Sequence, residues 1–124
     1  MSSHDPRVTL GQIQEFGRQT QQFCSETTLS EVRANWRHAS ILERQLECIG
    51  ESVKRLPAEL RERYPAVPWR KVAGMRDYIC HGYDDLDYQV LWDAAQLHVP
   101  LLMETAAQML ADLGGELPVD EGTG

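Results

Sequence analysis

Apolar side chains recur every three or four residues along nearly the whole chain, which is the spacing of one face of an α-helix. The most regular run starts at Val32 and continues through Trp36 to Leu56. It predicts a long core helix that ends at Leu56, because a residue that precedes proline is disfavoured in the helical conformation. Ser30 and Asn35 are both candidates for the residue that caps its start.

Three further segments share this periodicity. Residues 6–23 are expected to form a first helix, and another is expected to begin at Pro68. A final helix over about residues 88–113 contains Pro100, which removes one backbone hydrogen bond and predicts a kink. With a short helical turn over residues 58–64 and no strand-like alternation, the chain is predicted to be all-α, an up-and-down bundle of four main helices plus a short one.

The length of 124 residues suits one domain and is too short for two ordinary cores. We expect residues 1–113 to form this domain and residues 114–124 to form a flexible acidic tail. Hydrophobic residues make up 42% of the chain and charged residues 25%. These fractions are typical of soluble globular proteins and exclude a disordered or fibrous chain.

Targeting signals and metal-ligand spacings are missing from the sequence. No apolar run approaches the roughly 18 residues of a membrane span, and the N-terminus lacks the regions of a signal peptide, so we expect a cytoplasmic protein without a membrane partner. Three cysteines, at positions 24, 48 and 80, have no C-x-x-C spacing and are expected to be free thiols. His38 and His98 lack ligand partners at suitable spacing, so we predict no metal and no cofactor.

Charge is distributed unevenly along the chain. The net charge of −7 argues against a nucleic-acid-binding protein. All twelve basic residues, however, lie at or before Arg76, so residues 1–76 carry +3 and residues 77–124 carry −10. A solvated acidic helix with an acidic tail explains this asymmetry, and a local basic surface in the first part of the chain is also compatible with it.

Residues 74–83 combine a guanidinium, an imidazole and two phenols. On a continuous helix His81, five residues after Arg76, points about 140° away from it. If the helix instead ends near His81 with Gly82 in a left-handed conformation, His81 can turn toward Arg76. A purely structural role is the alternative, with His81 at the helix dipole and Arg76 paired with the adjacent Asp77.

Arg76, His81 and Tyr83 form an R-x4-H-x-Y pattern. Other segments match the same family in order and spacing between about residues 32 and 110: Ile41–Arg44, Ile49–Glu51, Lys54–Leu56, Tyr64–Pro65, Pro68–Arg70, Ala73–Arg76 and His81–Asp84. On these residues the chain resembles the HepT-like toxins, which are members of the HEPN superfamily of α-helical ribonucleases.

The resemblance implies a metal-independent endoribonuclease that acts on RNA, not DNA, as a homodimer with the motifs of both protomers in one cleft. His81 then exchanges protons near neutral pH and Arg76 stabilises the phosphorane oxygens. Asp77 either orients one of these groups or is a solvated carboxylate. The resemblance also implies a type VII toxin–antitoxin module, in which a minimal nucleotidyltransferase antitoxin silences the toxin by transferring AMP to Tyr83.

Two other functions fit the sequence less well. A non-catalytic HEPN module that binds a nucleotidyltransferase or a nucleotide agrees with the acidic composition but has no need for Arg76, His81 and Tyr83 together. A plain helical dimerisation protein is the third possibility. Some residues are interpreted as structural: Trp36, Trp69 and Trp92 as core anchors and Cys80 as a half-buried thiol. Glu43, Glu47 and Glu51 form either a solvated acidic ridge or a carboxylate site.

Overall fold

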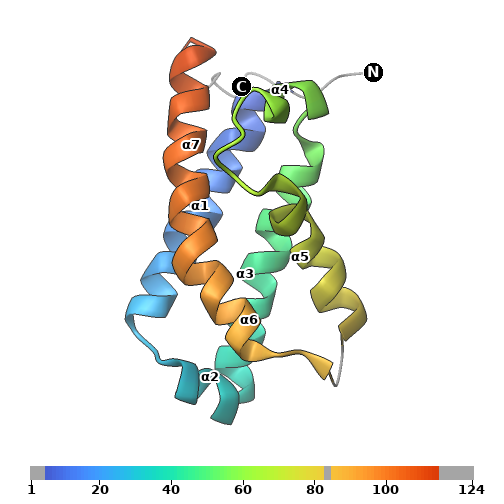
Figure 1. Ribbon diagram of the computed structural model, residues 1–124. Coiled ribbons are helices and arrows are strands. Elements are labelled where there is room, and N and C mark those ends of the chain that lie inside the picture. The colour runs from blue at the N-terminus through green and yellow to red at the C-terminus, as the bar shows by residue number, and fades with distance from the viewer. Residues whose placement is uncertain (1–4, 83–84, 115–124) are drawn as a thin grey trace, which may run out of the picture.

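The computed structural model describes residues 5–82 and 85–114, and every regular element in these ranges is helical (Figure 1). This confirms the all-α prediction. The elements are α1 (Pro6–Ser25), α2 (Leu29–Ala34), α3 (Trp36–Arg55), α4 (Ala58–Glu62), α5 (Trp69–Gly82), α6 (Tyr88–Asp93), the π-helical turn η2 (Ala94–His98) and α7 (Val99–Asp112). Because α6, η2 and α7 follow one another without a break, they form the fourth main helix, and the described residues contain two short helices where the sequence predicted one.

The predicted long helix that starts at Val32 is interrupted at Asn35. Asn35 has extended backbone angles, ends α2 and caps α3 by accepting a hydrogen bond from the Arg37 amide at 2.9 Å. The cap predicted at Asn35 is therefore confirmed, whereas Ser30 lies inside α2. The interruption changes the helical phase, which explains why Trp36, predicted to be a core anchor, is 70% exposed with the Arg37 guanidinium over its ring.

The core lies between α1, α3 and α7, which run side by side in Figure 1. Its fully buried side chains come from all three helices and include Leu10 and Ile13 of α1, Leu42, Ile49 and Val53 of α3, and Leu102, Ala106 and Met109 of α7. The α5 helix packs against the outer side of α3 and contributes Val72 and Ile79. The bundle therefore leaves much of α5 at the surface.

The distortion predicted near Pro100 takes the form of η2. In this wider turn the Val99 N–H donates a hydrogen bond to the Ala94 carbonyl, five residues earlier in the chain. Pro100 then lies in the first turn of α7, where a missing N–H costs little. Gly114 follows α7 with φ of 112°, so the predicted glycine stop is confirmed. Residues 115–124 lie outside the described ranges, and the predicted tail stays a prediction. None of the described helices is long and apolar enough to span a membrane.

Candidate active site

Gly50 sets how closely α5 approaches α3. A Cβ atom at Gly50 would lie 3.0 Å from the Arg76 backbone nitrogen and 3.1 Å from the Val72 carbonyl oxygen. Both are backbone atoms, which cannot move aside independently of the helix. The glycine therefore allows α5 to contact α3 directly at Arg76, the first residue of the candidate motif.

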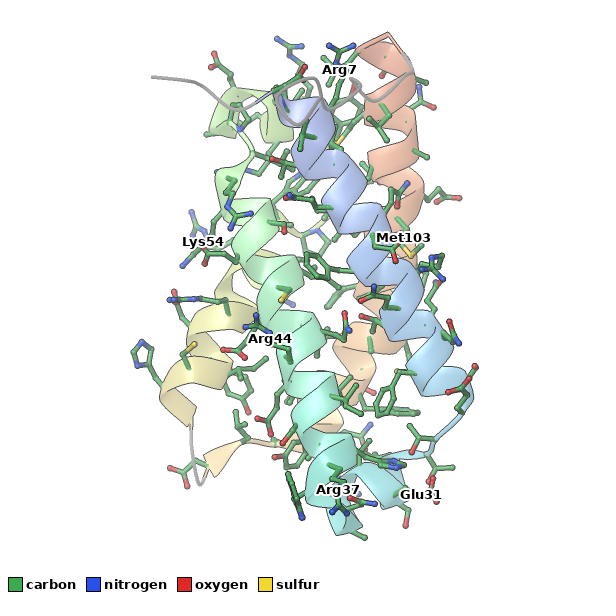
Figure 2. The ribbon with its side chains drawn as sticks, turned by 180° about the vertical axis from the view of Figure 1, so that it is seen from behind. Arg7, Glu31, Arg37, Arg44, Lys54 and Met103 are labelled. Atoms are coloured by element: carbon green, nitrogen blue, oxygen red, sulfur yellow. The ribbon has the colours of Figure 1, made fainter. Side chains whose placement is uncertain are left out.

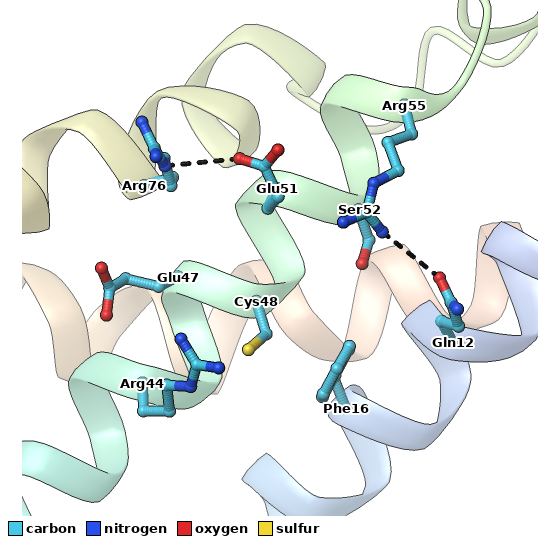
Figure 3. A pocket seen from close by; sticks show the side chains of 9 residues that line it. All are labelled: Gln12, Phe16, Arg44, Glu47, Cys48, Glu51, Ser52, Arg55 and Arg76. Atoms are coloured by element: carbon cyan, nitrogen blue, oxygen red, sulfur yellow. Dashed lines mark hydrogen bonds and ion pairs between the residues drawn. The ribbon is translucent and has the colours of Figure 1, made fainter.

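The Arg76 side chain is held by two carboxylates. Its Nε lies 3.3 Å from Glu51 Oε1 and its Nη1 lies 3.3 Å from Asp77 Oδ1. The side chain is 41% exposed, and Figure 3 shows it directed toward Glu51. A guanidinium has five N–H donors, so these two contacts leave it the capacity to bind a phosphate as well.

Asp77 joins α5 to α3 through Lys54, whose Nζ lies 3.2 Å from Asp77 Oδ1. The hydrogen bond from Lys54, and after it the one from Arg76, lowers the pKa of Asp77 below the ordinary aspartate value. Asp77 is thus a carboxylate inside a chain of ion pairs that runs from Lys54 to Arg76. Asp77 is 51% exposed and at the same time ion-paired on both sides, so its orienting role stays a prediction.

His81 lies in the last turn of α5 and is exposed. Of the two alternatives for this segment, the structure has the continuous helix and not the left-handed turn at Gly82, because α5 continues through Gly82 and the only glycine with positive φ among the described residues is Gly114. A Cβ atom at position 82 would lie 2.5 Å from Leu86 Cδ2, so the end of that leucine side chain would have to move aside. Within one chain, Arg76 and His81 therefore point about 140° apart.

Tyr83 lies outside the described residues, so its predicted modification stays a prediction. Two nearby tyrosines have defined partners. The Tyr78 hydroxyl accepts a hydrogen bond from the Asp87 amide at 2.9 Å, and the Tyr88 hydroxyl donates to Glu43 at 2.5 Å. Partial burial, together with the Glu43 carboxylate, raises the pKa of Tyr88 to about 12.

The three glutamates of α3 form neither a solvated ridge nor a shared carboxylate site. Each faces a polar group on α5 or α6: Glu51 faces Arg76, Glu47 accepts a hydrogen bond from the Cys80 thiol at 3.0 Å, and Glu43 faces Tyr88. We call these pairs, together with Lys54 and Asp77, the polar seam. Sequence reasoning missed this pairing, although the four-residue spacing of Glu47 and Glu51 matches that of Arg76 and Cys80.

Cys80 is half-buried, as predicted. Its hydrogen bond to Glu47 is the main cause of a thiol pKa above the ordinary value, with burial adding to the effect. The thiolate is the nucleophilic form of cysteine, so this environment disfavours a nucleophilic role for Cys80.

A surface groove of about 440 Å³ lies between α1, α3 and α5 (Figure 3). The side chains around it are Gln12, Phe16, Arg44, Glu47, Cys48, Glu51, Ser52, Arg55 and Arg76. Figure 2 shows Lys54 on the side of α3 that faces α5, and Arg44 nearer the start of the same helix. Three guanidinium groups around one groove suit a polyanionic substrate, and the carboxylates of the polar seam limit the excess of positive charge.

The other two histidines in the described residues, His38 and His98, have ordinary structural surroundings. The Nδ1 atom of His38 shares a hydrogen bond with the Thr27 hydroxyl at 2.7 Å, and the ring meets Phe23 edge-on. His98 lies beside apolar side chains such as Leu46 and Val99. In the part of the chain that the structure describes, no group of three histidine, cysteine or acidic residues lies close enough to hold a metal ion.

Comparisons with known proteins place the chain in a family of ribonucleases. A family model described as "Ribonuclease HepT-like" matches residues 13–109. Over 116 residues, 94% of this chain and 96% of the relative, the chain is 32% identical to "Putative RNase MJ0127" of Methanocaldococcus jannaschii. It is also 34% identical over 90 residues to "Probable ribonuclease HepT" of Thermococcus cleftensis, which covers 73% of this chain and 76% of that protein.

A further Methanocaldococcus jannaschii relative, "Putative RNase MJ1216", is 38% identical over 73 residues. That match spans 59% of this chain and 60% of the relative. No solved structure matches the chain.

Proposed function

Because the chain belongs to the ribonuclease HepT-like family, we propose that it is a metal-independent endoribonuclease in which Arg76 and His81 act on the scissile phosphodiester. The observation that carries this proposal is the placement of Arg76. Its guanidinium is held by Glu51 and Asp77 at the edge of an arginine-lined groove, on the same helix as the exposed His81. Such a preorganised donor can stabilise charge that develops on a phosphorane.

The proposed reaction uses the 2′-hydroxyl of RNA as the nucleophile. An imidazole accepts the 2′-hydroxyl proton, the oxygen attacks the adjacent phosphorus, and the bond to the 5′-oxygen breaks as a second imidazole donates a proton to it. The products are a 2′,3′-cyclic phosphate and a 5′-hydroxyl. Arg76 stabilises the phosphorane oxygens between these two proton transfers.

One chain supplies only part of this machinery. Arg76 and His81 diverge on the continuous α5 helix, and each motif has a single histidine. A two-fold axis would supply a second copy of both residues, so that Arg76 of one protomer can act with His81 of the other. The geometry of α5 therefore supports a homodimer with a composite active site.

Regulation by a nucleotidyltransferase is the second part of the proposal. In this view the protein is the toxin of a type VII toxin–antitoxin module, and a minimal nucleotidyltransferase antitoxin transfers AMP to Tyr83, two residues after His81. The added phosphodiester would compete with RNA for Arg76. Hydrogen bonds within the chain engage the hydroxyl groups of Tyr78 and Tyr88, which disfavours these two tyrosines as alternative acceptors of AMP.

The test is cleavage of a labelled single-stranded RNA by the purified full chain with and without EDTA. We expect His81→Ala and Arg76→Ala to abolish cleavage with an unchanged circular dichroism spectrum, EDTA to have no effect, and sedimentation to give about twice 14.1 kDa. His98→Ala is the matched control and should cleave normally. Cleavage by His81→Ala at the parental rate would contradict the assigned mechanism.

The regulatory proposal has its own test. Incubation with a cognate nucleotidyltransferase and Mg-ATP should add AMP to Tyr83 and stop RNA cleavage, and Tyr83→Phe should not accept the label. Peptide mass spectrometry distinguishes Tyr83 from Tyr78 and Tyr88. Full cleavage activity after complete labelling of Tyr83 would remove regulation from the proposal and leave the ribonuclease.

A further inference from the structure

Basic residues gather at one part of an otherwise acidic protein. Residues 51–77 contain seven of the twelve basic residues but only four of the nineteen acidic ones, in a chain whose net charge is −7. This segment covers the end of α3, all of α4 and the first two-thirds of α5. The sequence allowed a local basic surface in the first part of the chain, and the fold brings basic residues together in this segment.

A second surface hollow, of about 520 Å³, lies within this basic region and is lined in part by the Lys54–Asp77 ion pair, which does not line the arginine-lined groove. Three cations from three different helices line it: Lys54 of α3, Arg61 of α4 and Arg70 of α5. The carboxylates of Glu62 and Asp77 also line the hollow, so its excess of positive charge is small. Cations that converge from separate helices suit a chain of phosphates better than a single small anion.

Each of the three cations is oriented differently. Lys54 is bound to Asp77. The Nε of Arg61 donates to the Leu56 carbonyl at 3.2 Å, which fixes the guanidinium plane at the end of α3. Arg70 is exposed in the first turn of α5. The hollow thus combines two anchored cations with one that extends into solvent.

The wall of the hollow also provides a flat, fixed aromatic surface. Trp69 is half-buried, and its indole Nε1 donates to the Tyr64 carbonyl at 2.9 Å, so the ring has one defined orientation. An indole next to cations is a common arrangement in surfaces that bind single-stranded nucleic acid, because a base can stack on it.

Gly74 gives evidence for a ligand in the hollow that does not depend on the cations or on Trp69. It lies in the interior of α5 and borders the hollow, and a Cβ atom built on it would meet nothing within 4 Å. Glycine destabilises the interior of a helix relative to alanine, and no contact within the described residues requires it here. A position without a side chain lets the backbone of a ligand come close to the helix.

From these observations we propose that the hollow between α3, α4 and α5 binds the phosphate backbone of single-stranded RNA next to the cleavage site. The proposal rests on the proposed ribonuclease function for the identity of the ligand. Asp77 borders the hollow and contacts Arg76 at 3.3 Å, so an RNA strand that leaves the hollow passes directly to the motif arginine. The hollow thereby extends the active site by several nucleotides.

The experiment measures binding of a fluorescein-labelled 12-nucleotide RNA to the full-length His81→Ala variant by fluorescence anisotropy at several salt concentrations. In this background, Arg61→Gln combined with Arg70→Gln should weaken binding about tenfold. The slope of log affinity against log salt should fall by about 0.7 for each phosphate that the variant no longer neutralises. Arg33→Gln combined with Arg37→Gln removes the same charge from α2 and the first turn of α3, far from the hollow along α3, and should leave the affinity unchanged.

Gly74→Ala is the second variant, because it should fold at least as well as the parent protein. We expect it to weaken RNA binding severalfold with an equal or higher melting temperature and an unchanged sedimentation coefficient. Unchanged RNA affinity in both hollow variants would overturn the proposal. So would a Gly74→Ala protein that loses its dimer and binds RNA normally per protomer, because the hollow would then be a protein contact.

The outcome is separable from that of the ribonuclease proposal. If the parent protein binds RNA through the hollow but does not cut it, the hollow stands and the ribonuclease function fails. If the parent protein cuts RNA and the hollow variants bind it normally, the hollow fails and the ribonuclease function stands.

Discussion

The two faces of α3 hold the molecule together in different ways. One face buries Leu42, Leu46 and Ile49 in the hydrophobic core that also contains side chains of α1 and α7. The other carries Glu47 and Glu51, which belong to the polar seam with α5. Apolar burial is strong and non-directional, whereas half-exposed ion pairs contribute little free energy but define orientation. One helix thus separates stability from the positioning of the candidate active-site groups.

The largest expected effect on stability comes from a substitution on the apolar face of α3. Leu42 is fully buried, so Leu42→Ala should lower the free energy of unfolding by about 2–5 kcal/mol, because it removes buried apolar surface and leaves a cavity. Urea denaturation measures it. Ile41→Ala is the control on the same helix, since Ile41 is 42% exposed and its truncation should cost much less. Equal effects in the two variants would contradict the division between the faces.

The next effect concerns the contact between the two helices. Gly50→Ala places a methyl group about 3 Å from backbone atoms of α5 and should destabilise the fold by about 1–3 kcal/mol. Gly74→Ala is the matched control, because the same change there meets open space and should stabilise the fold by about 0.4–1 kcal/mol. Thermal unfolding compares the two, and a Gly50→Ala protein as stable as Gly74→Ala would show that α5 does not need this close approach.

Breaking the polar seam should affect catalysis more than folding. Glu51→Ala removes the carboxylate that contacts the Arg76 Nε, and we expect kcat for RNA cleavage to fall about 10- to 100-fold with little change in KM or melting temperature. Glu51→Gln keeps an oxygen acceptor and should recover part of the rate. Glu15→Ala, in an exposed ion pair on α1, should cleave normally. A Glu51→Ala protein that unfolds early but retains its kcat would reverse the interpretation.

The smallest effect concerns acid stability. Lys54 and Arg76 lower the pKa of Asp77 in the folded protein. Asp77 therefore contributes stability above the unfolded aspartate pKa of about 3.9, and this contribution disappears as the pH falls through the lower folded pKa. The melting temperatures of the parent and Asp77→Asn proteins should differ at pH 6 and converge in acid. A difference that stays constant with pH would exclude an electrostatic contribution.

Local signals in the sequence were enough for most of the helices. Periodicity predicted the four main helices, the side chain of Asn35 marked one start, and Gly114 marked one end. These features depend on residues within a few positions of each other, so one sequence contains them. The prediction that Trp36 is a core anchor was wrong for a related reason. A break of one residue changes the phase of the helix that follows, and the spacing of the apolar residues does not reveal the break.

The sequence by itself determined the helical content and the presence of Arg76 and His81 five residues apart on one element. Only the tertiary structure decided which groups those residues meet. The partners of the motif helix, Glu47 and Glu51, lie 33 and 25 residues away from Cys80 and Arg76 in the chain. Their pairing depends on the rotation and the close approach of two helices, and helical periodicity specifies a face within each helix but not the face of its neighbour.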